Sequence, residues 1–240
     1  MRDQRWWLVG ASEGLGRALA TAMAAEGARL ILSARGEERL RALAADLDAR
    51  ALPLDVSDPA AVAAAAEAAG PVDGLVYLAG AYWPMAARDW DSARIETMLD
   101  VNLHGAVRVL GHVLPGMIAR NEGRVVLTGS LAGFRGLPGS LGYGQSKAAL
   151  MSLGQSLQAD LRGTGVRVQL VNPGFIRTRL TDRNDFSMPF LMDPEEAAAH
   201  MLRAIRSGRP ATSFPTLFSW LFRAGRLLPT PVWNRLFARS

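Results

Sequence analysis

A strand that runs into a glycine-rich turn opens the chain, where residues 6–16 read WWLVGASEGLG. The apolar run 6–9 predicts a short buried strand, and a helical pattern follows the turn as far as residue 26. Glycines let a backbone approach a pyrophosphate closely, and the start of the following helix supplies N–H groups and partial positive charge. The spacing is G-x-x-x-G-x-G, and tight strand-to-helix turns also use glycine for steric reasons alone. The turn therefore indicates a dinucleotide site only if other features agree with it.

Predicted strands and helices alternate along the rest of the chain. The further strand-like apolar runs cover residues 30–33, 51–54, 73–78, 124–129, 166–171 and 211–214. The helical patterns cover residues 37–47, 58–69, 91–118, 143–161 and 195–206. This alternation predicts an α/β fold, a Rossmann-type doubly wound parallel β-sheet of about seven strands with helices on both faces. The pattern 91–118 is interrupted near Asn102 and Gly105, which indicates either a local distortion of the helix or a satisfied polar residue.

The composition is that of an ordinary globular protein, with 49% hydrophobic and 20% charged residues. There is no cysteine, which excludes disulfides and thiol chemistry. No linker or internal repeat divides residues 1–240, so we predict a single domain. No apolar run reaches the roughly 18–20 residues of a membrane span, and a strand at residues 6–9 leaves no room for a signal peptide, so we expect a cytoplasmic location. No metal site is visible, because His104 and His112 have no third ligand near them in sequence and are interpreted as structural.

The net charge of +5 is unevenly distributed. No acidic residue follows Glu196, whereas seven arginines do, and the first 196 residues carry a net charge of −2. The body of the chain therefore gives no reason to expect nucleic-acid binding. The basic character belongs to the C-terminal part, and we predict that residues 214–240 form a basic amphipathic extension.

The candidate catalytic residues are Tyr143 and Lys147 in the stretch YGQSK, with Ser130 at the end of the strand before it. On a helix, positions i and i+4 share one face, so the phenol and the ammonium point the same way. We expect the ammonium to pull the pKa of the tyrosine down from about 10 towards neutrality, where a general acid/base works. Lys147 is the single lysine among 27 basic residues, at a position where an arginine fork could not act as a compact point charge.

Cofactor choice depends on the end of the second strand, where Ala34 and Arg35 stand. A cofactor with a free 2′-hydroxyl calls for an acidic residue at this position. A guanidinium suits a 2′-phosphate, so the pair favours NADP(H), with NAD(H) still possible. The alternative is that Arg35 is a solvated residue at the start of a helix.

Together these features resemble the short-chain dehydrogenase/reductase family over residues 5–215. The shared features, in family order and spacing, are the glycine turn, Asp55 after the third strand, Ala79-Gly80, Asn102, Ser130 with Tyr143-x-x-x-Lys147, and Asn172-Pro173-Gly174. Each feature is weak alone, and their conjunction is strong. The resemblance implies an oxidoreductase that transfers a hydride between NAD(P)(H) and a carbonyl or secondary alcohol.

The same resemblance implies a role for each matching residue. Tyr143 is expected to give a proton to the carbonyl, Ser130 to hold the carbonyl oxygen, and Lys147 to tune Tyr143 and bind the nicotinamide ribose. Asn102 is expected to hold a water that links Lys147 to solvent. Ser130 and Tyr143 would also contact the substrate. The residues expected at the cofactor are Gly10, Ser12, Glu13, Gly14, Leu15, Gly16, Arg35, Asp55, Val56, Leu78, Ala79, Gly80, Asn102, Tyr143, Lys147, Pro173, Gly174, Ile176 and Thr178.

Three positions depart from the family pattern. Val9 stands where the family often has threonine, and Tyr77-Leu78 replace two asparagines, so a side-chain brace of the central strand is missing. Glu13 stands where many NADP-preferring members have a basic residue. An acid near the expected 2′-phosphate weakens the preference for NADP(H).

Two other functions compete with the enzyme. A catalytically inactive NAD(P)-binding sensor or scaffold would keep the fold and do no chemistry, and a membrane-surface protein would depend on the C-terminal extension. The sequence does not name the substrate. Residues 179–192 have no periodicity and are interpreted as a mobile lid. Trp83, Leu131, Phe134 and Leu137 are candidates for an apolar pocket wall.

The helix that carries Tyr143 also predicts an assembly. Its core-facing stripe is Leu150, Gly154, Leu157 and Leu161, and its opposite side carries Ala148, Ser152, Gln155 and Ala159. Small, weakly polar residues permit close approach of another helix, and the family commonly associates here, so a homodimer or homotetramer is expected. In the extension, aromatic residues and arginines interleave. They either lie in a membrane interface or cover the substrate pocket or a subunit contact.

Overall fold

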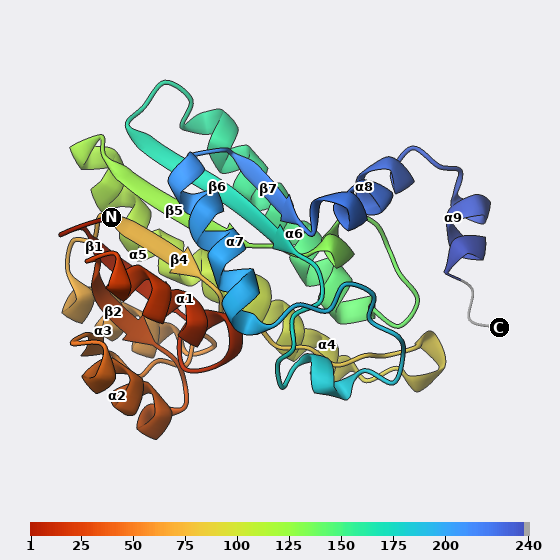
Figure 1. Ribbon diagram of the computed structural model, residues 1–240, viewed down its shortest axis with the longest axis horizontal. Helices are drawn as coiled ribbons and strands as arrows, with labels where there is room; N and C mark the ends of the chain where they lie inside the picture. Colours follow the sequence, from red (N-terminus) through yellow and green to blue (C-terminus); the bar gives the residue numbers. More distant parts are fainter. Residues whose placement is uncertain (238–240) are drawn as a thin grey trace.

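A seven-stranded parallel sheet forms the centre of the computed structural model, which describes residues 1–237 (Figure 1). The strands are β1 (Arg5–Val9), β2 (Arg29–Ser33), β3 (Arg50–Ala51), β4 (Gly74–Tyr77), β5 (Gly123–Thr128), β6 (Val166–Pro173) and β7 (Ala211–Phe214). Their order in the sheet is β3-β2-β1-β4-β5-β6-β7, and every neighbouring pair is parallel. The order reverses between β1 and β4, the place where open α/β sheets bind ligands outside the carboxyl ends of their strands. The predicted fold class is confirmed.

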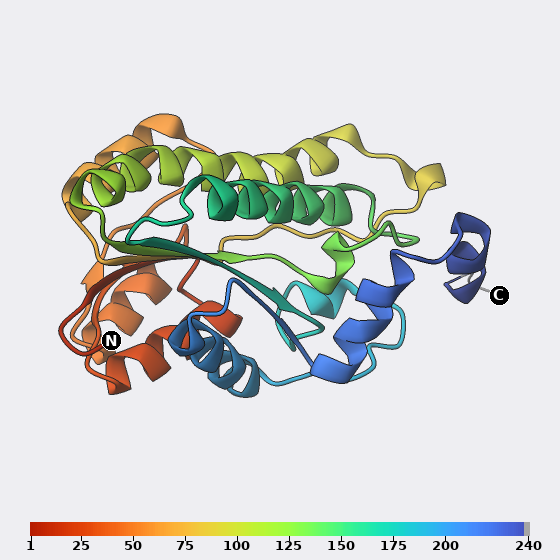
Figure 2. The same cartoon turned by 90° about the horizontal axis from the view of Figure 1, so that it is seen from above.

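Helices cover both faces of the sheet, as Figure 2 shows. One face carries α1 (Gly14–Ala25), α2 (Glu37–Asp46) and α7 (Pro194–Ser207), and the other carries α3 (Pro59–Ala69), α4 (Ser92–Leu99), α5 (Gly105–Arg120) and α6 (Leu141–Asp160). Alternate residues of a strand point to opposite faces, so Trp7 and Trp6 enter different apolar layers. Three short 3-10 turns lie in the loops, at Ala87–Asp89, Leu131–Gly133 and Thr181–Arg183.

The third strand is shorter than predicted, because only Arg50–Ala51 pair as a strand. Leu52 and Leu54 still donate their N–H groups to carbonyls of Leu32 and Ala34, at 2.8 and 3.1 Å. Pro53 lies between these two donors on the edge of the sheet, where an N–H group would point away from β2, so the bonds to β2 continue across it. The segment therefore continues beside β2 and carries Asp55 to the carboxyl edge of the sheet without being a regular strand. At the other end of the sheet, β6 runs two residues beyond the predicted 166–171, because Asn172 and Pro173 pair with β7.

The predicted interruption of the helix at 91–118 is a π-helical segment, Asp100–His104, between α4 and α5. Buried Asn102 lies in this segment. Its side-chain oxygen accepts from the N–H of Ala81 at 2.7 Å, and its amide nitrogen donates to the carbonyl of Ala81 and to the hydroxyl of Ser146, at 3.0 and 2.8 Å. The distortion and the satisfied polar residue are therefore one feature, which fastens the helix to the loop after β4.

Tyr77, which stands where the family pattern has an asparagine, forms a side-chain hydrogen bond that braces the central strand. Its buried hydroxyl donates to the carbonyl of Val101 at 2.6 Å, so the end of β4 is fixed to the π-helical segment. A Cβ at Gly105 would lie 2.4 Å from this hydroxyl, so glycine is required where α5 begins. Burial raises the pKa of Tyr77, which keeps its hydroxyl protonated and able to donate.

The C-terminal extension forms two helices, α8 (Thr216–Gly225) and α9 (Thr230–Leu236), beyond the carboxyl edge of the sheet (Figures 1 and 2). Trp233 is buried, and a Cβ at Gly225 would lie 2.1 Å from its ring. The indole N–H of Trp233 donates to the carbonyl of Gly136 at 2.7 Å, which ties α9 to the loop after β5. No helix within residues 1–237 is long and apolar enough to cross a bilayer.

Candidate active site

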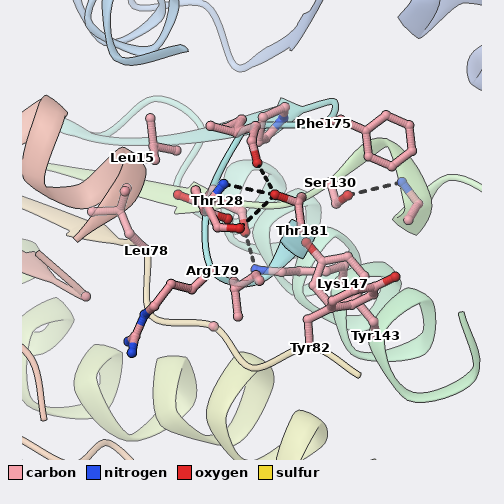
Figure 3. A pocket seen from close by; sticks show the side chains of 18 of the residues that line it. Leu15, Leu78, Tyr82, Thr128, Ser130, Tyr143, Lys147, Phe175, Arg179 and Thr181 are labelled. Atoms are coloured by element: carbon pink, nitrogen blue, oxygen red, sulfur yellow. Dashed lines mark hydrogen bonds between the residues drawn. The ribbon is translucent and has the colours of Figure 1, made fainter. Parts of the chain in front are cut away.

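One cavity of about 650 Å³ lies outside the carboxyl ends of the strands. Nearly every residue expected at the cofactor lines it, from the glycine turn through the ends of β3, β4 and β6. Figure 3 shows Leu15 and Leu78 on one side of this pocket and Ser130, Tyr143 and Phe175 on the other. The exception is Asn102, which does not line the cavity and bonds instead to Ala81 and Ser146, the sequence neighbours of the lining residues Gly80 and Lys147.

The glycine turn is packed too tightly for side chains. Gly10 has a φ of +99°, and a Cβ there would lie 2.4 Å from the backbone nitrogen of Ala79. A Cβ at Gly16 would lie 2.0 Å from the carbonyl oxygen of Gly10, and one at Gly14 would lie 2.8 Å from the methyl group of Thr178. No side chain caps the start of α1, whose first turn lines the cavity. The turn therefore presents uncapped backbone N–H groups at a place where a phosphate can approach them.

Charged side chains gather where the cavity meets the ends of β2 and β3. Arg35, Arg39 and Asp55 all line this region. Burial alone would raise the pKa of Asp55, but hydrogen bonds from the hydroxyl and N–H of Ser57, at 2.6 and 2.9 Å, and the charge of Arg35 lower it overall. Asp55 is therefore ionised at neutral pH and lies within the field of Arg35.

The carboxylate of Glu13 is neutralised by two nearby arginines. It accepts a hydrogen bond from Arg179 at 2.5 Å and lies 4.0 Å from Arg39. The bond to Arg179 connects the glycine turn with the segment after β6, and it raises the pKa of Arg179. Neither Arg39 nor Arg179 could be singled out from the sequence, because they come close to Glu13 only when the chain is folded.

Ser130, Tyr143 and Lys147 meet at the centre of the cavity (Figure 3). Ser130 follows β5 by two residues, and its hydroxyl accepts from the N–H of Ala132 at 3.2 Å. The ammonium of Lys147 donates to the carbonyl of Thr128 at 2.9 Å and lies 5.8 Å from the centre of the Tyr143 ring. The lysine is thus held at the end of β5, with its ammonium over the face of the Tyr143 ring.

The expected direction of the Tyr143 pKa is wrong. Burial of the hydroxyl raises the pKa of Tyr143, and the hydrogen bond with Ser130 offsets only part of that rise. Burial also lowers the pKa of Lys147 to about 8, which weakens it as a permanent positive charge. The expectation considered the attraction between the two groups and left out the cost of desolvating each of them.

Two further contacts position Tyr143 and Lys147. The ring of Tyr82 meets the ring of Tyr143 edge-on at 4.9 Å, and its hydroxyl donates to Asn184 at 2.6 Å. Thr128 provides the carbonyl that holds Lys147. Sequence reasoning missed both, although Thr128 could have been found as the last residue of a buried strand that ends at the site. The water relay expected of Asn102 stays a prediction.

The other end of the cavity is apolar. Leu131 and Leu137 line it as expected, but Trp83 and Phe134 do not. Trp83 packs in the core below Arg183, whose guanidinium lies 4.7 Å from its ring, and Phe134 packs against the C-terminal extension. The remaining wall comes from aromatic residues that the sequence did not assign to the pocket, namely Phe175, Phe186, Phe218, Phe222 and Phe237.

The expected lid and extension both take part in this wall. Residues 179–192 contribute Phe186 and Pro189, and the extension contributes Phe218, Phe222 and Phe237. Covering the pocket is therefore a role that the extension plays in this structure. Other apolar residues of the extension face outward, including Leu217 and Trp220, which are 79% and 59% exposed. No group of three potential metal ligands occurs among residues 1–237.

Comparison with known families agrees with this geometry. The sequence profile of the family described as short chain dehydrogenase matches residues 6–187. An oxidoreductase of Myxococcus xanthus, named as uncharacterized, is 39% identical over 236 residues, which cover 95% of this chain and 93% of that protein. Sulfoacetaldehyde reductase 2 of Chromohalobacter salexigens is 43% identical over 184 residues, covering 72% of this chain and 73% of that protein.

Solved structures give the same result. A short-chain dehydrogenase from Streptomyces avermitilis superposes with a TM-score of 0.85 at 27% identity, covering 98% of this chain and 95% of that one. A short-chain dehydrogenase from Sphingobium yanoikuyae in complex with NADPH superposes with a TM-score of 0.84 at 28% identity, covering 93% of each chain.

Proposed function

Given that this chain belongs to the short-chain dehydrogenase/reductase family, oxidoreductases that act on CH–OH or C=O groups, we propose that it transfers a hydride between NADP(H) and a carbonyl or secondary alcohol, with Tyr143 as general acid/base. The observation that carries this proposal is the meeting of Ser130, Tyr143 and Lys147 in the cavity that the glycine turn opens. A carbonyl placed there has a proton donor and a second hydroxyl within one site.

The residues present fit a pyridine dinucleotide. The glycine turn leaves no room for a Cβ and presents uncapped N–H groups, and Arg35 and Arg39 lie beyond Ala34, with no acid at the end of β2. NAD(P)H, when bound, supplies the hydride. Gly14 and Thr178 would close around the phosphates, Asp55 and Val56 would lie at the adenine, and Lys147 would reach the ribose next to the nicotinamide.

Tyr143 suits the reduction of a carbonyl at neutral pH. Because burial raises its pKa, the phenol keeps its proton and acts as the acid that the carbonyl oxygen needs. Ser130 would donate to the same oxygen and stabilise the negative charge that develops there. Lys147, held by Thr128, would orient the ribose and carry positive charge below its pKa of about 8.

Two arginines support the preference for NADP(H), and NAD(H) is the weaker alternative. Arg35 and Arg39 provide a planar cationic surface where a 2′-phosphate would lie. The objection raised by Glu13 is smaller than the sequence suggested, because Arg179 and Arg39 balance its charge. The named reductase of Chromohalobacter supports a carbonyl as the substrate group.

We also propose a homo-oligomer, a dimer or a tetramer, formed through α5 and α6. Exposed residues with small or weakly polar side chains lie on the outer side of α6 at Ala148, Ser152, Gln155 and Ala159. Beside them a shallow apolar groove runs between the helices, and Val107 and Ile118 at its rim are each 48% exposed. Sedimentation should show an oligomer that Ala159→Glu dissociates, and a monomeric wild type would refute the assembly.

A panel of carbonyl substrates assayed with NADPH and NADH side by side tests the function. We expect hydride transfer to at least one carbonyl, with a lower KM for NADPH. The alternative, an inactive sensor or scaffold, would bind the cofactor and reduce nothing in the panel. A cytoplasmic location remains our expectation, and cell fractionation would test it.

A further inference from the structure

The apolar end of the cavity carries information about the substrate. Its wall includes Leu131, Phe175, Phe186, Phe218, Phe222 and Phe237, which come from three separate segments. We infer that the substrate is a neutral carbonyl compound or alcohol with a bulky apolar body, aromatic or long-chain alkyl, that fills this wall. The inference rests on the proposed function and names the substrate class of the same site.

The aromatic residues of the wall form a continuous series of ring contacts. The ring centre of Phe175 lies 6.0 Å from that of Phe186 and 6.2 Å from that of Phe218. Phe218 meets Phe222 edge-on at 5.1 Å, and Phe222 lies 6.2 Å from Phe237. The series therefore runs from the segment after β6 to Phe237 of the extension, and it offers a substrate one extended apolar surface.

This wall is anchored to the rest of the protein. One guanidinium nitrogen of Arg135 donates to the carbonyls of Gly225 and Leu228, the latter at 2.7 Å, and the other donates to the hydroxyl of Thr230 at 3.2 Å. The guanidinium also lies 5.2 Å from the centre of the Trp233 ring. The extension is thus fastened to the loop after β5, so the apolar surface exists before a ligand arrives, which lowers the entropic cost of binding.

No cation faces the apolar end among the described residues that line the cavity. The lining cations are Arg35, Arg39, Arg179 and Lys147. Arg179 is bonded to Glu13, Lys147 is bonded to the carbonyl of Thr128, and Figure 3 shows the Arg179 side chain extending away from Ser130 and Phe175. The polar side chains near the apolar end, such as Asn184 and Ser187, are neutral.

Charge therefore discriminates between possible substrates. A carboxylate or sulfonate attached to the carbonyl compound would leave water and enter an aromatic wall without a counterion, which is strongly unfavourable. A neutral alkyl or aryl group gains from the same transfer, roughly fourfold in affinity for each methylene that becomes buried. The site consequently selects large neutral bodies over small or anionic ones.

Steady-state kinetics of the full chain with NADPH test this inference. We expect kcat/KM to rise by at least 10-fold from propanal to decanal, and to be lower for 2-sulfoacetaldehyde than for decanal by a similar or larger factor. Equal values for propanal and decanal, or a preference for the sulfonated aldehyde, would overturn the substrate class while leaving the proposed reaction in place.

A binding measurement separates the two proposals when turnover is absent. Calorimetry in the presence of NADP⁺ with decanamide, a neutral and unreactive carbonyl compound, should show binding, and acetamide and decane-1-sulfonate should bind more weakly or not at all. Binding of decanamide without turnover of any aldehyde would support the apolar site and contradict the proposed reaction. Absence of decanamide binding would overturn the apolar site.

A matched pair of variants on α8 assigns the effect to the wall. Phe218 lines the cavity, whereas Trp220 is 59% exposed and does not. Phe218→Ala should lower kcat/KM for decanal by roughly 10-fold or more and leave propanal unchanged, and Trp220→Ala should change neither. If Phe218→Ala fails to fold, Phe218→Leu should give the same pattern with a smaller loss. Equal losses for both aldehydes in a folded Phe218 variant would contradict the inference.

Discussion

The two ends of the cavity are built in different ways. One end, called the cofactor end here, is formed by the glycine turn and the ends of β2 and β3. Its shape is determined by the backbone, because Gly10 and Gly16 pack against other main-chain atoms at distances that exclude a Cβ. At the apolar end, side chains determine the shape, through ring contacts among Phe175, Phe218 and Phe222. Of the six charged residues that line the cavity, Glu13, Arg35, Arg39, Asp55 and Arg179 lie at the cofactor end and Lys147 lies at the centre, whereas the described residues of the apolar end are neutral.

This difference explains how a common fold acquires an individual substrate. A surface made of backbone changes little when side chains are replaced, so it can bind the same cofactor in many relatives. A surface made of side chains from distant segments changes with each substitution. The two ends meet at Tyr143, so the strongest test of the comparison is made there.

Tyr143→Phe should give the largest effect. Removing the hydroxyl removes the proton path, and turnover should fall by about 10²- to 10⁴-fold, while NADPH affinity stays as it is because the cofactor end is intact. Tyr82→Phe is the matched control, since it keeps the ring that contacts Tyr143 and removes a hydroxyl that donates to Asn184. Kinetics and a fluorescence titration measure the two quantities. Unchanged turnover in Tyr143→Phe would remove the residue from the chemistry.

Arg35→Ala tests the charges of the cofactor end. NADPH binding should weaken by about 1.5–3 kcal/mol, the range for hydrogen bonds to charged groups, and NADH binding should stay nearly unchanged. Arg41→Ala is the control, because Arg41 lies on α2, the helix that follows Arg35, pairs with Glu37 and does not line the cavity. Titrations with both cofactors give the answer. An equal loss for NADPH and NADH would show that Arg35 supports the fold.

Lys147 connects the two ends and gives a prediction on pH. The unfolded lysine keeps its proton to about pH 10.5 and the folded one only to about pH 8, so between these values the unfolded state binds more protons and stability rises with pH. Urea unfolding should show this rise from pH 8 towards 10, at most roughly 1.4 kcal/mol per pH unit, and Lys147→Met should lack it. Near pH 10 the raised pKa values of Tyr77 and Tyr143 act in the opposite direction. A wild type whose stability is flat or falling from pH 8 to 9 would contradict this.

Glu13→Gln should give the smallest effect. The carboxylate pairs with Arg179, but the side chains of Arg179 and Glu13 are 65% and 43% exposed, and such solvent-exposed pairs contribute at most about 1 kcal/mol. Neutralising Glu13 frees Arg179 and Arg39 for a phosphate, so NADPH should bind slightly tighter, by no more than about fivefold. Glu37→Gln outside the cavity is the control. Weaker NADPH binding in Glu13→Gln would mean that the link to Arg179 shapes the cofactor end.

That the residues expected at the cofactor lie together could be predicted from sequence, because they belong to short local motifs. The glycine turn, Arg35, Ala79-Gly80 and Pro173-Gly174 each follow a recognisable strand. A parallel sheet brings the carboxyl ends of its strands to one edge, so these residues had to lie together once the strands were identified. The predicted strand at 51–54 was too long, because only Arg50–Ala51 form a regular strand, but Leu52 and Leu54 still bond to β2 and keep Asp55 at the carboxyl edge.

The apolar end could not be predicted in the same way. Whether Phe134 or Phe218 faces the cavity depends on how the extension packs, and that depends on contacts between Arg135 and backbone carbonyls far along the chain. The direction in which the pKa of Tyr143 shifts could not be predicted from sequence either. The spacing shows that Lys147 is near, but it does not show how deeply the Tyr143 hydroxyl is buried.

The contact between Tyr77 and the start of α5 constrains how this chain can evolve. A Cβ at position 105 would lie 2.4 Å from the Tyr77 hydroxyl and 2.8 Å from the Val56 side chain. A lineage that gains any side chain at position 105 must therefore shrink both neighbours, and one that keeps Tyr77 must keep Gly105. Positions 56, 77 and 105 are expected to covary among descendants of this chain. A chimeric protein that takes the residue at only one of these three positions from another parent would have a steric clash or an unfilled space behind its cofactor end.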